Sequence, residues 1–157
     1  MANSPVMSFP PFRLYHAAYV ATDMTKGTRR LSGTHGVKDF EFYENIRIEV
    51  PGGIADIDVA LGQAGVMPIE VIVPRGGKDG VYRQALSSDP DAITFHHFCS
   101  LVESGEEWNQ VLETIEKCRL EVLVRGSGYG TRGYVYIDTR PTLGHIVEFL
   151  YREDAAA

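Results

Sequence analysis

Two stretches decide the fold of this chain: Pro68-Ile69-Glu70-Val71-Ile72-Val73 and His145-Ile146-Val147-Glu148-Phe149-Leu150. Each holds one carboxylate inside an otherwise apolar run that is typical of a β-strand. Each follows, at nearly the same spacing, an apolar run that carries a histidine, either Tyr15-His16-Ala17 or His96-His97-Phe98. Because an unpaired carboxylate is costly to bury, two of them within strands need partners, and one shared metal ion is the simplest partner. The pattern predicts a duplicated scaffold in which two histidines and two glutamates surround one divalent cation.

The bulk composition indicates an ordinary globular protein. The 157 residues are 44% hydrophobic and 23% charged, enough for one compact domain. A net charge of −6 and scattered basic residues argue against binding to nucleic acid. No apolar run approaches the roughly 20 residues that span a bilayer, and the first residues lack the features of a secretory signal. Cys99 and Cys118 have no metal-site spacing, so we expect reduced thiols in a cytoplasmic protein without membrane partners.

The order of predicted elements repeats once along the chain. Strands are expected over 12–21, 39–50, 54–63 and 66–73, with a short helix after Asp23, and then again over 92–102, 120–125, 134–139 and 145–151, with a helix after Ser104. The sequence therefore predicts a single α+β domain over 12–151, made of βαβββ modules over 12–73 and 92–151. The ends, 1–11 and 152–157, are expected to be flexible.

The alternation of side chains along each strand predicts which residues face a cleft. Glu70 lies opposite a continuous apolar face, so it is expected to point into the concave side of a curved sheet whose helices cover the outer side. Asp58 lies opposite Ile57, Val59 and Leu61 and is expected to face the cleft by the same reasoning. His96 and His97 are neighbours, so only one of them is expected to reach it. Ala18, Ala60 and Ile72 are expected to make the pocket fairly apolar.

Four segments give the chain a resemblance to the vicinal oxygen chelate superfamily, and within it to glyoxalase-like and methylmalonyl-CoA-epimerase-like members. They are Leu14-Tyr15-His16-Ala17-Ala18-Tyr19-Val20, Pro68-Ile69-Glu70-Val71-Ile72, Phe95-His96-His97-Phe98 and Gly144-His145-Ile146-Val147-Glu148-Phe149. The likeness extends from about residue 12 to residue 151. It implies two tandem βαβββ modules that form a cupped mixed sheet with a cation at the bottom. The family pattern assigns the metal ligands to His16, Glu70, His97 and Glu148.

The resemblance also implies a chemistry. Two imidazoles and two carboxylates suit Zn²⁺, Ni²⁺, Co²⁺, Mn²⁺ or Fe²⁺. Such an ion acts as a Lewis acid and stabilises the enolate or enediolate formed when a proton next to a carbonyl is removed. Glu148 is the first candidate for the carboxylate that carries this proton. Asp58 is the second, and it is chosen only because its side of the strand is expected to face the cleft. Arg132 and Tyr134, at the end of a glycine-rich flap, are candidates for binding an anionic substrate.

We therefore expect a metal-dependent isomerase or epimerase that acts on a small carbonyl compound, which includes acyl thioesters. The first alternative is a glyoxalase I-type lyase that acts on a thiol hemithioacetal, since glyoxalase I commonly has glutamate where Glu70 stands and epimerases often have glutamine. The second is a non-catalytic small-molecule-binding protein of the same fold, a class that commonly lacks the full set of four ligands. The resemblance also implies a homodimer. It leaves open whether one chain or two complete the site.

Overall fold

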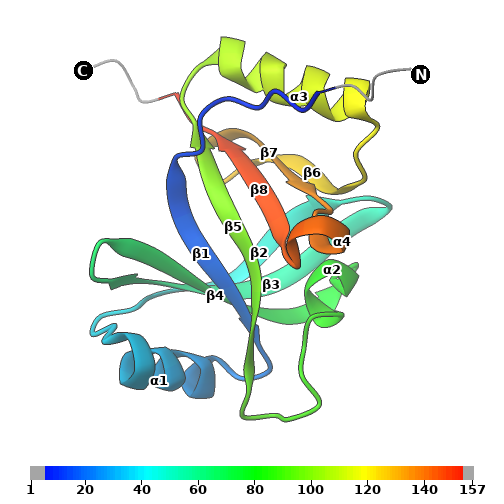
Figure 1. Ribbon diagram of the computed structural model, residues 1–157. Coiled ribbons are helices and arrows are strands. Elements are labelled where there is room, and N and C mark those ends of the chain that lie inside the picture. The colour runs from blue at the N-terminus through cyan, green and yellow to red at the C-terminus, as the bar shows by residue number, and fades with distance from the viewer. Residues whose placement is uncertain (1–5, 154–157) are drawn as a thin grey trace.

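The computed structural model describes residues 6–153 and contains the predicted repeat (Figure 1). The first module consists of β1 (Leu14–Ala21), α1 (Met24–His35), β2 (Glu41–Val50), β3 (Gly53–Ala64) and β4 (Met67–Gly77). After the short helix α2 (Gly80–Arg83), the second module consists of β5 (Ile93–Val102), α3 (Gly105–Cys118), β6 (Val122–Gly128), β7 (Thr131–Ile137), the short helix α4 (Arg140–Leu143) and β8 (Ile146–Tyr151). The predicted α+β class is confirmed.

All eight strands form one mixed sheet in the order β2-β3-β4-β1-β5-β8-β7-β6. β1 and β5 lie side by side and antiparallel at its centre, β4 is parallel to β1, and β8 is parallel to β5. Read outward from the centre, the second module therefore repeats the strand order of the first. A single chain builds the whole cupped sheet.

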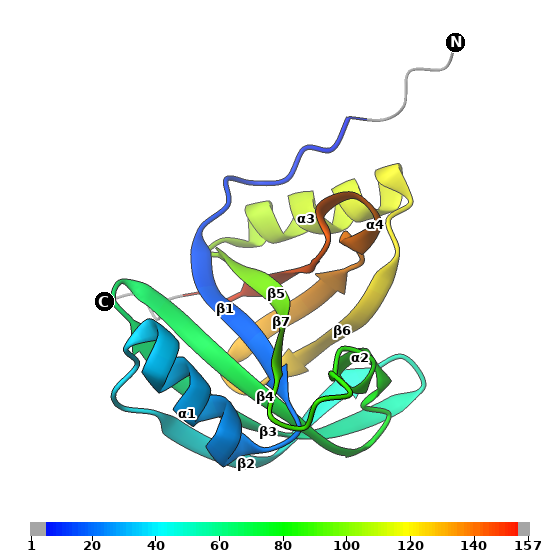
Figure 2. The ribbon, with the colours of Figure 1, turned by 60° about the horizontal axis from the view of Figure 1, so that its bottom comes forward.

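The two long helices cover the outer side of the sheet, one for each module (Figure 2). Leu31 of α1 packs in a cluster with Ile69, Val71 and Val73 of β4. Val111 of α3 packs in a second cluster, which includes Val135 of β7. Because the apolar side of β4 is buried under α1, the opposite side of that strand faces the inside of the cup, as predicted for Glu70.

The outermost strands, β2 and β6, approach each other and nearly close the sheet. The free edge of β2 donates two backbone hydrogen bonds to tyrosines of the second module, from Arg47 N to Tyr129 Oη at 2.7 Å and from Glu49 N to Tyr134 Oη at 3.1 Å. Gly126 permits this approach, since a Cβ atom there would lie 2.4 Å from Tyr134 Oη and 2.9 Å from Glu49 Cβ.

Side-chain caps define the starts of both long helices. Asp23 accepts a hydrogen bond from Lys26 N at 2.8 Å, and Ser104 accepts one from Glu107 N at 3.2 Å. α1 stops at Gly36, which has the left-handed conformation with φ 67°. Burial of Leu31 and Thr28 stabilises the helix through the exposed Gly33.

The chain before β1 packs on the second module. The ring of Phe9 stacks on Phe149 with 4.7 Å between centroids, and Ser8 O accepts hydrogen bonds from Gln110 and Thr114 of α3. The flexibility expected for 1–11 and 152–157 stays a prediction, and 1–5 and 154–157 lie outside the described residues. Among residues 6–153, none of the helices combines the length and the apolar character needed to cross a bilayer.

Candidate metal centre

Strand register aligns the predicted ligands in two neighbouring rows across the inside of the cup. In one row Glu70 of β4 pairs with Ala18 of β1, and Ala18 pairs with His97 of β5. In the other row His16 pairs with Cys99, and Cys99 pairs with Glu148 of β8. Residues paired in this way share a side of the sheet. The small residues Ala18 and Cys99 separate the four larger polar side chains, so the latter can converge above them.

The four polar ends meet at the centre of the sheet. The Nε2 atoms of His16 and His97 are 3.3 Å apart. Glu148 Oε2 lies 3.0 Å from His97 Nε2 and 3.4 Å from His16 Nε2, and Glu70 Oε2 lies 3.3 Å from His16 Nε2 and 3.8 Å from His97 Nε2. His16, His97 and Glu148 are buried, while the Glu70 side chain retains 15% exposure. Each module contributes one histidine and one glutamate.

This set of donors fits a divalent cation. Two carboxylates and two imidazole nitrogens converge in a buried place, and in the metal-free protein only protons balance the carboxylate charge. Burial disfavours the charged form of His16, but Glu70 and Glu148 outweigh this effect and raise its pKa to about 10. Burial likewise disfavours the charged form of Glu148, but hydrogen bonds from His16 and His97 hold its pKa far below the ordinary value. Electrostatics therefore favours positive charge between the carboxylates.

His96 holds the ring of His97 from behind. A β-bulge at this point leaves His96 without a partner on β1, so its ring lies on the same side as that of His97 instead of the opposite side. His96 does not line the cavity of the cup, and its ring supports His97 instead. His96 Nε2 donates to Val81 O at 2.9 Å, and the Nδ1 atoms of the two rings are 2.8 Å apart. Burial and the charge of His97 lower the pKa of His96 to about 4.

The hydrogen bonds of His96 determine which nitrogen of His97 carries a proton. A neutral His96 that donates through Nε2 must accept through Nδ1, so His97 Nδ1 carries the proton of their shared hydrogen bond. His97 Nε2, which hydrogen-bonds to Glu148 in the metal-free protein, is therefore the nitrogen that would give up its proton and offer a lone pair to a metal ion.

Cys99 adds a sulfur atom to the same place. His16, Cys99 and Glu148 form a second buried group whose potential ligand atoms lie within 4.8 Å of one another. Burial and the nearby Glu148 raise the pKa of the Cys99 thiol well above its ordinary value, so it stays protonated at neutral pH. A protonated thiol is a weaker ligand than the two imidazoles and the two carboxylates.

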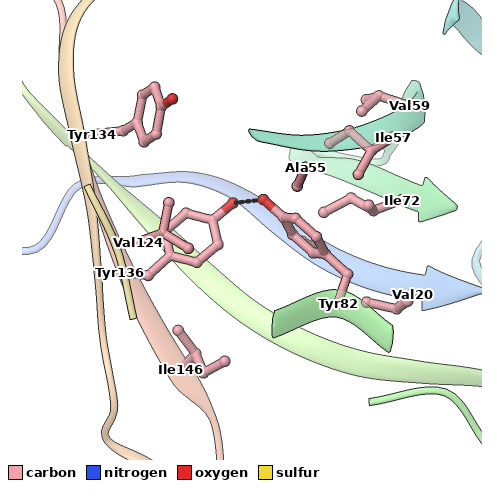
Figure 3. Close-up of a cluster of buried hydrophobic side chains, with 11 residues drawn as sticks. Val20, Ala55, Ile57, Val59, Ile72, Tyr82, Val124, Tyr134, Tyr136 and Ile146 are labelled. Atoms are coloured by element: carbon pink, nitrogen blue, oxygen red, sulfur yellow. Dashed lines mark hydrogen bonds between the residues drawn. The ribbon is translucent and has the colours of Figure 1, made fainter. Parts of the chain in front are cut away.

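The cluster lies at the bottom of a cavity of about 980 Å³. Its walls are largely apolar, with Ile57, Val59 and Ile72 on one side and Tyr134 on the other (Figure 3). Between them the hydroxyls of Tyr82 and Tyr136 meet at 3.1 Å.

Both tyrosines support the histidines below them. The Tyr82 ring packs on His96 with 5.4 Å between centroids, and the Tyr136 ring packs on His97 with 4.8 Å. Sequence reasoning missed both residues. The position of Tyr136, two residues after Tyr134 on one strand, was a usable signal, whereas Tyr82 lies in the linking segment and gave none.

Asp58 lies on the outer side of the sheet, so the prediction that it faces the cleft is wrong. It pairs with Val73, which is buried under α1, and it accepts hydrogen bonds from Arg75 Nε at 2.6 Å and Asn45 N at 2.9 Å. Ala60 also packs under α1. The reasoning assumed that the more apolar side of β3 meets the helices. The cup is itself lined with Ile57 and Val59, so apolar character does not separate the two sides.

The candidates for substrate binding have different positions. Tyr134 lines the cup, and its hydroxyl accepts the hydrogen bond from the edge of β2. Arg132 lies at the rim, where its guanidinium is exposed and paired with Glu153 at 2.7 Å, and it does not line the cavity. The glycine-rich segment forms the turn between β6 and β7, and Tyr129 at its tip lines the mouth of the cup.

A doubled βαβββ sheet that closes into a cup is the vicinal oxygen chelate fold, and the resemblance is confirmed at the level of the fold. Methylmalonyl-CoA epimerase from Streptomyces coelicolor, solved with 2-nitronate-propionyl-CoA, matches at a TM-score of 0.61 and 14% identity, over 94% of this chain and 100% of that one. The epimerase from Mycobacterium tuberculosis matches at a TM-score of 0.58 and 11% identity, over 90% and 89%. A hypothetical protein from Bacillus halodurans matches at 0.61 and 16%, over 94% and 99%. No family description and no curated sequence matches the chain.

Proposed function

We propose that this protein is a divalent-metal-dependent enzyme of the isomerase or epimerase type, which moves a proton next to the carbonyl of a small organic substrate. The observation that supports this most directly is the convergence of His16, Glu70, His97 and Glu148 at the bottom of an open cup. The fold is shared with methylmalonyl-CoA epimerases, whose reaction is of this kind. A protein that only binds small molecules has no need for four convergent ligands.

The four side chains would hold one ion through His16 Nε2, His97 Nε2 and an oxygen of each glutamate. Such an ion supplies Lewis-acid stabilisation of the negative charge that develops on a substrate carbonyl oxygen. The apolar walls exclude water and strengthen electrostatic interactions inside the cup. His96 fixes His97 in the tautomer whose free nitrogen faces the ion.

Glu148 is the proposed proton carrier. Its side chain is buried, and its Oε2 faces the space shared by the other three candidate ligands. In the proposed reaction this carboxylate takes the proton from the carbon beside the carbonyl and returns a proton to the substrate, so it is regenerated in each cycle. Asp58 has no part in this scheme because it lies on the outer side of the sheet.

One observation favours a second candidate, a glyoxalase I-type lyase. The ligand on β4 is Glu70, where epimerases of this superfamily often carry glutamine. A hemithioacetal substrate would undergo the same proton abstraction beside its carbonyl group. The two candidates therefore differ in the substrate and share the site.

The test combines metal analysis with solvent-deuterium exchange over acyl thioesters, α-keto acids and hemithioacetals. We expect about one metal ion per chain and deuterium incorporation into a member of one substrate class. Glu148→Gln is expected to lower the exchange rate by at least about a hundredfold, within the range of general acid–base contributions. His35→Ala, an exposed histidine outside the cup, is the matched control. Full exchange by Glu148→Gln, or by protein without bound metal, would contradict the proposal.

A further inference from the structure

We infer that the substrate is a carbonyl compound with a bulky apolar body and without phosphate groups, so that a coenzyme A thioester is not its substrate. This inference rests on the proposed function for the chemistry, and its own support comes from the walls of the cup.

Both walls of the cup are apolar well above the metal ligands. On the first module the wall consists of Ile46 and Ile48 of β2, Ile57 and Val59 of β3 and Ile72 of β4. On the second module it consists of Tyr134 and Tyr136 of β7 and Leu150 of β8. A cavity of about 980 Å³ is far larger than a carbonyl group with two or three carbons requires. A substrate gains affinity here by burying apolar surface against both walls.

The mouth of the cup extends this apolar surface. Tyr129, at the tip of the β6–β7 turn, lines the cavity while 60% of its surface is exposed. Its hydroxyl accepts a hydrogen bond from Arg47 N, which fixes the ring beside β2. An exposed ring held in this way offers a flat contact for an aromatic or alicyclic body.

The charges around the cup do not suit phosphate groups. Among the described residues that line it, Arg152 is the sole basic side chain outside the proposed metal centre, and its guanidinium donates a hydrogen bond to Tyr15 Oη at 2.6 Å. Asp39 and Glu41 line the same cavity in addition to the two carboxylates of the metal centre. Coenzyme A carries several negative charges, and proteins bind such groups with arginine, lysine or the start of a helix.

Neighbouring arginines are already paired with carboxylates. Arg132 is bound to Glu153 at 2.7 Å, and Arg75 is bound to Asp58 at 2.6 Å on the outer side of the sheet. Phosphate groups at the mouth of the cup would therefore meet Asp39 and Glu41 with one cation to offset them. The repulsion opposes a coenzyme A carrier and leaves an uncharged body free to enter.

The test uses chelating probes that share one metal-binding end. Acetohydroxamate, benzohydroxamate and 2-naphthohydroxamate present the same two oxygens and differ in the size of the apolar body. On the metal-loaded protein, calorimetry is expected to give at least about tenfold tighter binding of benzohydroxamate than of acetohydroxamate, and tighter binding still of the naphthyl compound. Millimolar coenzyme A is expected to displace none of them. Equal affinity for the three probes, or salt-dependent displacement by coenzyme A, would overturn the inference.

Variants of the half-buried Ile48 test whether the wall of β2 causes the preference for larger apolar probes. Ile48→Asp is expected to weaken benzohydroxamate about tenfold and to leave acetohydroxamate within twofold, while Leu143→Asp, on the exposed α4 outside the cup, changes neither. Ile48→Lys is expected to create measurable affinity for coenzyme A, and it provides a second test should the aspartate variant fail to fold. If all folded Ile48 variants still prefer benzohydroxamate to acetohydroxamate as the parent does, this wall does not bind the apolar body of the substrate, and the inference is contradicted.

A metal-independent measurement separates this inference from the proposed function. Calorimetric titration with Zn²⁺ and Co²⁺ is done first, and a lack of binding would overturn the metal-dependent enzyme. The cup is then probed with Nile red, an uncharged apolar dye. Fluorescence enhancement that Ile48→Asp removes and Leu143→Asp retains would support the apolar site, and its absence would overturn it.

Discussion

At the scale of single residues, the proposed metal centre depends on what surrounds its four candidate ligands. Ala18 lies between Glu70 and His97 across the sheet, and Cys99 lies between His16 and Glu148. Both side chains are small and leave space above the sheet. His96 orients one ligand from behind, and Tyr136 packs against the same ring. These supporting contacts determine protonation states, which leads to three predictions.

Metal binding is expected to release a proton from His16. The pKa of His16 in the metal-free protein is about 10, above its ordinary value of 6.5, so the ring is cationic at neutral pH. A metal ion binds the neutral ring, so affinity rises by up to about tenfold per pH unit between pH 7 and 9. Calorimetry in buffers with different protonation enthalpies measures the released proton. Zinc affinity that does not change over this range would contradict the prediction.

The same shift affects the stability of the metal-free protein. A raised pKa in the folded state stabilises it most fully below about pH 6.5, and this stabilisation is lost as the pH rises towards 10. His35→Ala, which changes an exposed histidine, is expected to leave the pH dependence intact.

Replacing His96 by Phe is expected to weaken metal binding. The phenyl ring can still pack on Tyr82, but it cannot accept the hydrogen bond from His97 Nδ1. Loss of a partner of this kind lowers metal affinity by roughly 10- to 100-fold. Long-range ¹H–¹⁵N spectra are expected to show a slowly exchanging proton on His97 Nδ1 in the parent and the loss of this protection in the variant. His145→Phe, whose ring packs between Phe95 and Phe98, is the control.

At the scale of elements, the sequence predicted strands better than it predicted their sides. The side of β4 was predicted correctly because Ile69, Val71 and Val73 form an unbroken apolar row under α1. On β3 both sides are buried in places, so the same reasoning put Asp58 on the wrong side. The bulge at His96 has no signal in side-chain alternation, since it is the extra residue that breaks the alternation.

The four candidate ligands were predicted from a resemblance that spans both modules, and the register of the central strands brings these four side chains together. Spacing along the chain could show that each histidine precedes a glutamate by a similar distance. It could not show the role of Tyr82 or of His96. Tyr82 makes its contact from α2 and His96 from a β-bulge, and no local sequence pattern predicts either contact. The supporting groups of a site are therefore harder to predict than its ligands.

Replacing Gly126 by Val is expected to open the contact between β6 and β2. The nearest atoms to an added Cβ are Tyr134 Oη at 2.4 Å and Tyr134 Cζ at 2.7 Å, so the ring or the strand must move. We expect a loss of about 1–3 kcal/mol in the free energy of unfolding, which chemical denaturation measures. Gly33→Ala, where an added Cβ meets no atom within 4 Å, is the matched control and is expected to lose no stability. Unchanged stability of the Gly126 variant would show that the two strands separate readily.

At the scale of the whole molecule, one chain brings all four candidate ligands together. The antiparallel pair β1–β5 joins the two modules and brings His16 beside His97. We therefore expect each chain to bind one ion at any dilution, including dilutions at which any dimer dissociates.

Binding of this ion is expected to stabilise the folded protein. At a free metal concentration about 100 times the dissociation constant, the gain is about 2.7 kcal/mol, which corresponds to a rise in Tm of roughly 5–10 °C for a chain of this length. Thermal melting with and without EDTA measures it, and His97→Ala is expected to show no rise. A rise that depends on protein concentration would indicate a site shared between chains.

The tyrosine hydroxyls along β2 also bear on aggregation. A strand at the border of a sheet normally exposes amide groups to which a strand from another molecule can attach. Here Tyr129 and Tyr134 already occupy the amide groups of Arg47 and Glu49. An incoming polypeptide would have to displace both phenols before it could pair there. The contact that closes the cup therefore also opposes aggregation through this edge. A variant with phenylalanine at both Tyr129 and Tyr134 is expected to form fibrils sooner.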